Sequence, residues 1–254
     1  MNVGKFLPCW VVAATALFAQ SSLSAPAPKE KTEPKPSAQE ETAEPAEMTI
    51  LTARANRTKS QNNLKQIVLA VHNYASASAS SVDLPANIVD KNGKALLSWR
   101  VHLLPYLEAG QLFKQFKLDE PWDSENNIKL LEQMPKVFEN PRVKLKKKGY
   151  TVYLGFEGNG ALFGSKLNLS NIPDGTSNTI LCVESSVALP WTKPVDMPFD
   201  PKKDLPDIGK AYDGKPYAAM CDGSVRLLNM KTLSAETLKN AIMTSDGIPL
   251  GKDW

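Results

Sequence analysis

The segment SQNNLKQIVLAVHNYA, residues 60–75, sets the fold because it predicts one long helix at the start of the folded region. Its apolar residues recur at steps of three and four positions, which places them on one face of an α-helix. They are Leu64, Ile67, Val68, Val71 and Ala75. The preceding turns carry Arg54, Arg57 and Lys59 with little apolar face, so we expect that part of the helix to be frayed or solvated.

Upstream of the helix, residues 1–24 have the features of a secretory signal peptide. Lys5 precedes a short apolar stretch, residues 8–19, and small residues at Ser22 and Ser24 predict cleavage after Ser24. The stretch is too short for a stable span, and a retained membrane anchor is the alternative. Residues 25–49 are rich in Pro, Glu and Lys and lack aromatics, which predicts a disordered linker, either a plain spacer or a tether. We therefore expect an exported protein, periplasmic or extracellular, with one folded domain at residues 50–254.

The composition of the 254 residues is that of an ordinary globular protein, with 22% charged and 42% hydrophobic residues. A formal net charge of +3 is too small to indicate nucleic-acid binding. No segment after the leader is apolar enough to predict a membrane span. Loss of the leader removes Cys9 and leaves Cys182 and Cys221, which an exported protein can join in a disulfide. Two small buried thiols are the other interpretation.

Downstream of the helix, short helices give way to strands. Ser98 and Ser234 each precede an apolar run, which predicts the N-caps of a short helix that Pro105 kinks and of a last helix. Residues 124–134 predict another helix, ended by Pro135. Strands are predicted near residues 86–89, 150–156, 179–184, 217–221 and 225–228. The last two flank Asp222-Gly223, a hairpin signal because both residues tolerate positive φ. The sequence predicts an α+β fold, a long N-terminal helix on an antiparallel β-sheet with extra short helices and a C-terminal helix.

Six groups of phrases, in one order between residues 58 and 247, carry a resemblance to a known family. They are NNLKQI (62–67) with HNY (72–74), SWR (98–100) with LLPYLE (103–108), PWDS (121–124), DGTSNT (174–179), PWTKP (190–194) and DGSVR (222–226). Together they resemble the large planctomycete family of pilin-like proteins of unknown function, once labelled bacterial solute-binding-like. That family is similar to type IV pilins and the pseudopilins of secretion systems. The resemblance implies export and a long N-terminal helix packed on an antiparallel sheet.

The chain departs from the family pattern in two places. It has no prepilin cleavage motif followed by a long apolar helix, and the predicted signal peptide and linker stand there instead. The family's C-terminal signature is a histidine, nine residues and then Asp-Gly. Asp222 and Gly223 match it, but Tyr212 occupies the histidine position. A role that needs an imidazole is lost at that position, whereas packing or hydrogen bonding is compatible with a tyrosine.

Asp174, Ser177 and Asn178 gather oxygen donors around the Asp174-Gly175 turn. Some pseudopilins hold calcium in a loop near the sheet, so the resemblance implies a candidate calcium site here. The spacing is not that of a known calcium loop. A turn whose side chains satisfy its own backbone is the preferred interpretation, and no other cofactor is expected.

Two charged stretches and two histidines are the other polar candidates. The basic run comprises Arg142, Lys144, Lys146, Lys147 and Lys148, and predicts a solvated loop or edge strand, with contact to an anionic surface or acidic polymer as the alternative. The acidic residues of the proline-rich segment 189–216 are interpreted as solvated charge: Asp196, Asp200, Asp204, Asp207 and Asp213. His72 and His102 lie on different predicted helices and lack metal-ligand spacing, so we expect His72 to be a packing residue.

The sequence shows no pairing of a nucleophile with a base, so it predicts no catalytic residue. We expect Trp99, Tyr106, Trp122 and Trp191 to belong to the core because they carry large apolar area. The resulting hypothesis is an exported, non-enzymatic, pilin-like domain that acts by protein or surface contact in the cell envelope. A small-solute or glycan binder with residues 189–216 as a lid is the alternative. A hydrolase ranks last.

Overall fold

The structure, a computed structural model, describes residues 45–78, 84–163, 165 and 167–254. These residues fall within one compact unit, Ala43–Trp254. The predicted signal peptide and most of the predicted linker lie outside the described residues. Helix α1, Pro45–Ala77, begins inside the range expected for the linker. Within the described residues, no helix is both long enough and apolar enough to span a bilayer.

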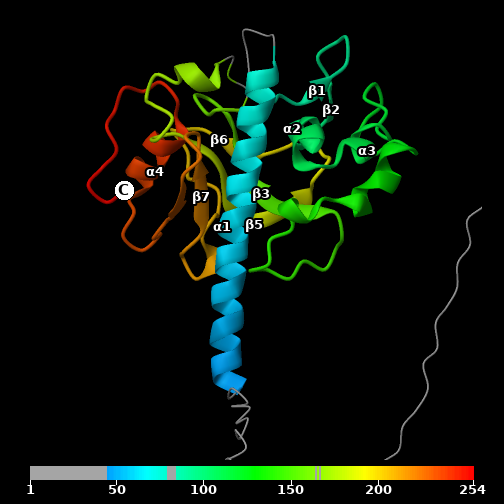
Figure 1. Cartoon of the computed structure of the whole chain (residues 1–254). Helices are drawn as coiled ribbons and strands as arrows, with labels where there is room; N and C mark the ends of the chain where they lie inside the picture. The colour runs from blue at the N-terminus through cyan, green and yellow to red at the C-terminus, as the bar shows by residue number, and fades with distance from the viewer. Residues whose placement is uncertain (1–44, 79–83, 164, 166) are drawn as a thin grey trace, which may run out of the picture. The chain divides into compact units, whose positions relative to one another are not determined.

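Helix α1 has two unlike halves (Figure 1). All residues from Glu47 to Lys59 are exposed except Asn56, which is half-buried. Burial begins at Ser60, and the predicted apolar face from Leu64 to Val71 then packs against strand β7 and the short helices η1 and η3. The periodic pattern therefore marks the half of the helix that contacts the sheet, as expected.

The main sheet has four antiparallel strands in the order β3-β5-β7-β8. The strands are β3 Tyr150–Leu154, β5 Ile180–Pro190, β7 Tyr217–Met220 and β8 Val225–Leu227. Two small sheets flank it, an antiparallel pair of β1 Ile88–Val89 with β2 Ala95–Leu97 and a parallel pair of β4 Phe156–Gly158 with β6 Met197–Phe199. The predicted α+β fold, with a long N-terminal helix on an antiparallel sheet, is confirmed.

The β7–β8 hairpin forms where Asp222-Gly223 predicted it, with a different conformation. Only Gly223 has a positive φ, 93°, and the backbone N–H of Gly223 donates to the carbonyl of Met220. Asp222 instead uses Oδ1 to accept from the backbone N–H and the hydroxyl of Ser224. The aspartate therefore stabilises the turn through its side chain rather than through a left-handed backbone.

The short helices follow their capping and proline signals. Ser98 caps α2, Trp99–His102, and Ser234 caps α4, Ala235–Ile242, each through its hydroxyl oxygen. Pro105 lies in the first turn of the 3₁₀ helix η1, Leu104–Leu107, where its missing N–H costs least. The remaining helices are α3 Gly110–Phe113 and the 3₁₀ segments η2 Asn127–Gln133, η3 Lys136–Phe138, η4 Leu169–Asn171 and η5 Lys210–Tyr212.

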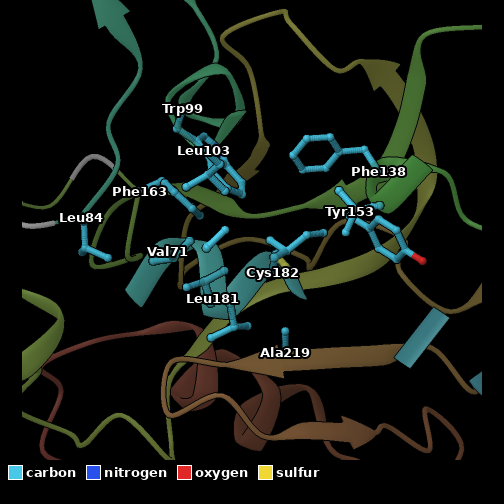
Figure 2. Close-up of a cluster of buried hydrophobic side chains, with 14 of the residues drawn as sticks. Val71, Leu84, Trp99, Leu103, Phe138, Tyr153, Phe163, Leu181, Cys182 and Ala219 are labelled. Carbon is cyan, nitrogen blue, oxygen red and sulfur yellow. The ribbon is translucent and has the colours of Figure 1, made fainter. Parts of the chain in front are cut away.

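The core has two parts, one on each face of the main sheet. The part beneath α1 includes Val71, Tyr153, Cys182 and Ala219, which Figure 2 shows converging from helix and strands. The other part gathers side chains from the opposite sheet face and from α4. Trp99 and Trp191 are fully buried, and Tyr106 and Trp122 pack against the core while partly exposed, so the expected core role of these four aromatics is confirmed.

Candidate functional site

Glu184 lies in the middle of β5 with its carboxylate fully buried, and it accepts hydrogen bonds from four directions. Ser60 Oγ of α1 donates at 2.5 Å, Asn140 Nδ2 at 2.8 Å and the backbone N–H of Tyr217 at 2.8 Å. The guanidinium of Arg142 completes the set with an ion pair. A buried carboxylate is tolerated only when it is paired and hydrogen-bonded in this way. These contacts connect α1, strands β5 and β7 and the loop before β3 through the Glu184 carboxylate.

Aromatic rings hold the Arg142 side chain in place. Its guanidinium carbon lies 4.8 Å from the ring centroid of Tyr212 and 5.0 Å from that of Tyr217, within cation–π range. Nη2 donates to the carbonyl of Lys215 at 3.0 Å, and the Arg142 backbone N–H donates to Asn140 Oδ1 at 2.7 Å. These contacts hold Arg142 in one position, and we call the set of contacts centred on Glu184 and Arg142 the joint. The assignment of Arg142 to a solvated basic run was wrong.

Tyr212, at the signature position, is a buried member of this joint. Its hydroxyl donates to the carbonyl of Ser185 at 3.2 Å, and Asn140 Nδ2 lies 3.4 Å from the same oxygen. Burial, reinforced by the negative charge of Glu184, raises the pKa of Tyr212, which therefore stays protonated. The tyrosine packs and donates a hydrogen bond, the kind of role that remained compatible with loss of the histidine.

The other signature residues, Asp222 and Gly223, lie at the far end of β7 from Tyr212. There the backbone N–H of Asp222 donates to the carbonyl of Thr176, and a ring nitrogen of His72 lies 2.9 Å from the carbonyl of Cys221. The signature therefore marks the two ends of one strand rather than one cluster. His72 has the packing role expected of it, against the hairpin.

A shallow hollow of about 200 Å³ opens beside the joint, between α1 and the turn after η5. It is lined by Ala53, Asn56, Arg57, Arg142, Ala211, Tyr212 and Asp213. Next to it, Lys146, Lys147 and Lys148 border a second hollow of about 420 Å³. Four donors already occupy the acceptor sites of Glu184, so its carboxylate is not available as a base. What this surface presents to a ligand is positive charge.

A second buried ion pair joins Arg100 to Asp196. Asp196 Oδ1 accepts from Arg100 Nη2 at 2.6 Å and from the backbone N–H of Gly155 at 2.7 Å, and Oδ2 accepts from Trp99 Nε1 at 2.8 Å. Asp196 was expected to be solvated charge in a loop, and this interpretation was wrong. The residue is buried because β6 pairs with β4 and carries the carboxylate to the buried indole and guanidinium of SWR.

Sequence reasoning missed Glu184, Ser60 and Asn140 as partners. The available signal was a single carboxylate in the apolar run ILCVE, because a charge inside a buried strand requires a partner of opposite charge. The pattern gives no indication of which cation that partner is.

The candidate calcium loop is organised by backbone contacts. The two carboxylate oxygens of Asp174 accept from the backbone N–H groups of Asp246 and Gly247, at 2.8 and 2.9 Å. Asn178 Nδ2 donates to the carbonyl of Asp174 at 2.9 Å, which is the turn-stabilising contact expected as the alternative to a metal. Among the residues that the structure describes, no group of three or more His, Cys, Asp or Glu side chains is arranged to hold a metal ion. Calcium binding by Asp174, Ser177 and Asn178 stays a prediction.

Cys182 and Cys221 are both free buried thiols, so the structure does not form the disulfide that the sequence left open. Cys182 is opposite Ala219 in the β5–β7 register, which makes Cys221 a diagonal neighbour on the same face. Diagonal neighbours are separated by about 7–8 Å, whereas a disulfide needs Cα atoms within about 7 Å of each other.

One family model matches the chain. It is SBP_bac_10, described as "Protein of unknown function (DUF1559)", and it matches residues 52–144. No curated protein and no solved structure matches the chain. Over this stretch the chain is therefore similar to a domain of unknown function. The matched residues include both arginines of the buried pairs, Arg100 and Arg142, while their carboxylates Asp196 and Glu184 lie beyond it.

Proposed function

We propose that this chain is an exported, non-enzymatic, pilin-like domain of the cell envelope that acts by contact with a protein or a surface. The exposed half of α1, residues 47–59, carries this proposal. At a rise of about 1.5 Å per residue it extends roughly 20 Å beyond the packed half. It presents Met48, Ile50 and Leu51 with 55%, 53% and 46% of their surface exposed.

A helix of this kind needs a reason to persist. Isolated helices of about a dozen residues are marginal in water, and most helix stability in proteins comes from packing of an apolar face. Within the exposed half of α1, the Thr52 hydroxyl donates to the carbonyl of Met48 at 2.8 Å, a contact inside the helix that covers no apolar surface. A contact that covers Met48 and Leu51 would stabilise the helix and bury apolar surface at the same time.

Export is supported by the apolar stretch at residues 8–19 after Lys5 and by the small residues at Ser22 and Ser24. The pilin-like part of the proposal is supported by a long N-terminal helix laid on an antiparallel sheet, which the structure contains. N-terminal sequencing of the chain recovered from the producing cells should begin at Ala25. A chain that still starts at Met1 and stays in the cytoplasm contradicts export.

Site-directed photocrosslinking in intact cells tests the contact. A photoreactive residue replaces Leu51 in one variant and Lys91, an exposed position in the β1–β2 turn, in a matched control. We expect a discrete adduct from position 51 that is several-fold stronger than any from position 91. Equal adducts at both positions, or none at position 51 in an exported and folded chain, contradict the proposal.

A second candidate function, the small-solute or glycan binder, is favoured by one hollow in the segment expected to form a lid. This hollow measures about 410 Å³ and is bordered by residues 205–210 together with Gly214, Met230 and Lys231. That volume lies in the range of small-ligand sites. Saturable quenching of tryptophan fluorescence by a sugar, lost in Met230→Lys, would favour the binder over the contact domain.

A further inference from the structure

Exposed cations from three separate segments surround the place where α1 leaves the domain. We call this set the basic rim, and it comprises Arg54, Arg57, Lys144, Lys146, Lys147, Lys148 and Lys215. Arg57 lines one hollow with Arg142, and Arg142 in turn binds the carbonyl of Lys215. The loop that carries the lysines is fixed to α1 through Asn63, whose Nδ2 donates to the carbonyl of Glu139 at 2.8 Å. Figure 1 shows this loop at the base of the domain, beside the emerging helix.

The rim is strongly positive, and the side-chain contacts of its lysines are weak: Lys147 Nζ lies 5.5 Å from the ring centroid of Tyr150. Three carboxylates lie among the seven cations: Glu132, Glu139 and Asp213. The ion pair between Lys148 and Glu132 is a loose contact of 3.9 Å between exposed groups. Exposed pairs of that kind contribute little and are readily exchanged. The domain therefore concentrates positive charge at one edge although the whole chain is nearly neutral.

The basic loop is held at both ends. At its start, the buried pair of Arg142 with Glu184 anchors the backbone beside the hollow. At its end, Gly149 has a φ of 72°, and a Cβ there would lie 2.3 Å from the carbonyl oxygen of Leu131, so only glycine fits. The cations between these points sit on a loop with fixed ends, which lowers the entropy cost of binding.

We propose that the basic rim binds a linear acidic polysaccharide, with carboxylate or sulfate groups along its length. This inference rests on the proposed contact function and names the chemical class of the partner. Lysines on an exposed loop act as point charges, so they suit a repeating anion better than one precisely shaped ligand. A chain of anions can follow the basic loop and also meet the cations of α1.

A flat anionic membrane fits this geometry poorly. Beyond the rim, residues 45–53 of α1 add roughly 13 Å of helix at the same edge of the domain. To bring the rim against a bilayer, the part of the helix beyond the rim would enter the lipid with Glu47, and burying such a charge in lipid is costly. A polymer strand makes no such demand.

The test uses the full chain as purified from exporting cells. Binding is measured to immobilised heparin and to polygalacturonate, which supply sulfate and carboxylate groups, and to neutral dextran. The test variant changes Lys144, Lys146, Lys147 and Lys148 to Gln. The matched control changes four exposed lysines away from the rim to Gln: Lys91, Lys94, Lys114 and Lys252. Both variants lose the same net charge.

We expect the wild-type chain to bind at least one acidic polymer and not dextran, with affinity that falls steeply as NaCl rises from about 50 to about 200 mM. The rim variant should bind about tenfold more weakly or worse, since each exposed ion pair contributes little alone and four are lost together. The control variant should stay within about twofold of wild type.

Three results would overturn the proposal: no binding to either acidic polymer at low salt, an equal loss in the control variant, or binding to vesicles of phosphatidylglycerol and phosphatidylcholine in preference to the polymers. Circular dichroism confirms that each variant is folded. Photocrosslinking at position 51 is repeated in the rim variant. If the wild-type chain binds neither acidic polymer but the adduct at position 51 still forms, the polysaccharide is rejected and the proposed contact function is retained.

Discussion

Two buried ion pairs among the described residues use the same chemistry in opposite settings. Arg100 and Asp196 are both sealed, with 1% of each side chain exposed. Arg142 keeps 10% of its side chain exposed at a hollow, while its partner Glu184 is fully buried. We call Arg142 and Glu184 the open pair and Arg100 and Asp196 the sealed pair. The sealed pair packs under Trp99, whose ring stacks on Phe163 at 4.7 Å. The open pair lies between the core and the basic rim.

This difference separates a structural joint from one that reaches the surface. Water cannot replace Asp196 as the partner of Arg100, whose Nε is already buried without a hydrogen bond in the part of the chain described. Water at the hollow can solvate Arg142 if Glu184 is removed. We therefore expect the sealed pair to control global stability and the open pair to control the order of the basic loop.

The largest expected effect is that of Asp196→Ala. It leaves Arg100 buried without its carboxylate and removes the acceptor of Trp99 Nε1 and of the Gly155 N–H, so the free energy of unfolding should fall by about 3–5 kcal/mol. Urea denaturation measures this loss. Asp204→Ala, a change at an exposed residue of the same acidic segment, should stay within about 0.5 kcal/mol of wild type. Similar losses in both variants would contradict the burial of Asp196.

Glu184→Ala should have a smaller global effect and a larger local one. Arg142 can turn to water, so we expect a loss of about 2–3 kcal/mol from the donors left unpaired inside. Trypsin should cut after the lysines at 144–148 about tenfold faster under native conditions, because the anchor of that loop is lost. Asp196→Ala is the control, since its cleavage should be spread over the chain. Loop-specific cleavage in that variant would remove the distinction between the pairs.

These partners show what the sequence could and could not predict. Local signals sufficed where one residue organises its own neighbours: Ser98 and Ser234 cap helices, and Asp222-Gly223 closes a hairpin as predicted. The spacing of Leu64 to Val71 likewise identified the buried face of α1. Each of these signals depends on contacts within a few positions, which propensity and periodicity describe well.

The ion pairs depend on residues 96 and 42 positions apart, and nothing local brings such residues together. Asp196 looked solvated because it lies in a segment rich in proline and aspartate, and only the pairing of β6 with β4 buries it. Glu184 was predicted to lie in a strand, but the identity of its donors depends on how α1 and the loop at 139–142 cross that strand. The candidate site is thus a product of tertiary packing.

Cys182 is a probe of the sealed pair, because the charges of both Arg100 and Asp196 affect the pKa of its thiol. Burial raises the pKa of the Cys182 thiol to about 12, with Arg100 lowering it and Asp196 raising it. At about pH 8 only about one thiol in ten thousand is ionised, so native protein should resist iodoacetamide and unfolded protein should react. Asp196→Ala should speed native labelling, and Glu184→Ala should do so far less. Rapid labelling of the wild-type chain would contradict burial of this strand.

The smallest effect belongs to Tyr212→Phe, which removes one hydroxyl from the open pair and keeps the ring over Arg142. The lost hydrogen bond to the carbonyl of Ser185 should cost about 0.5–1.5 kcal/mol in urea denaturation. Trypsin cleavage of the basic loop should barely change, because Arg142 keeps Glu184 and both rings. Tyr212→Ala is the comparison, since it also removes the ring and should raise loop cleavage. If Tyr212→Phe loosens the loop as much as Tyr212→Ala does, the hydroxyl rather than the ring holds the arginine, and the joint depends on hydrogen bonding more than on packing.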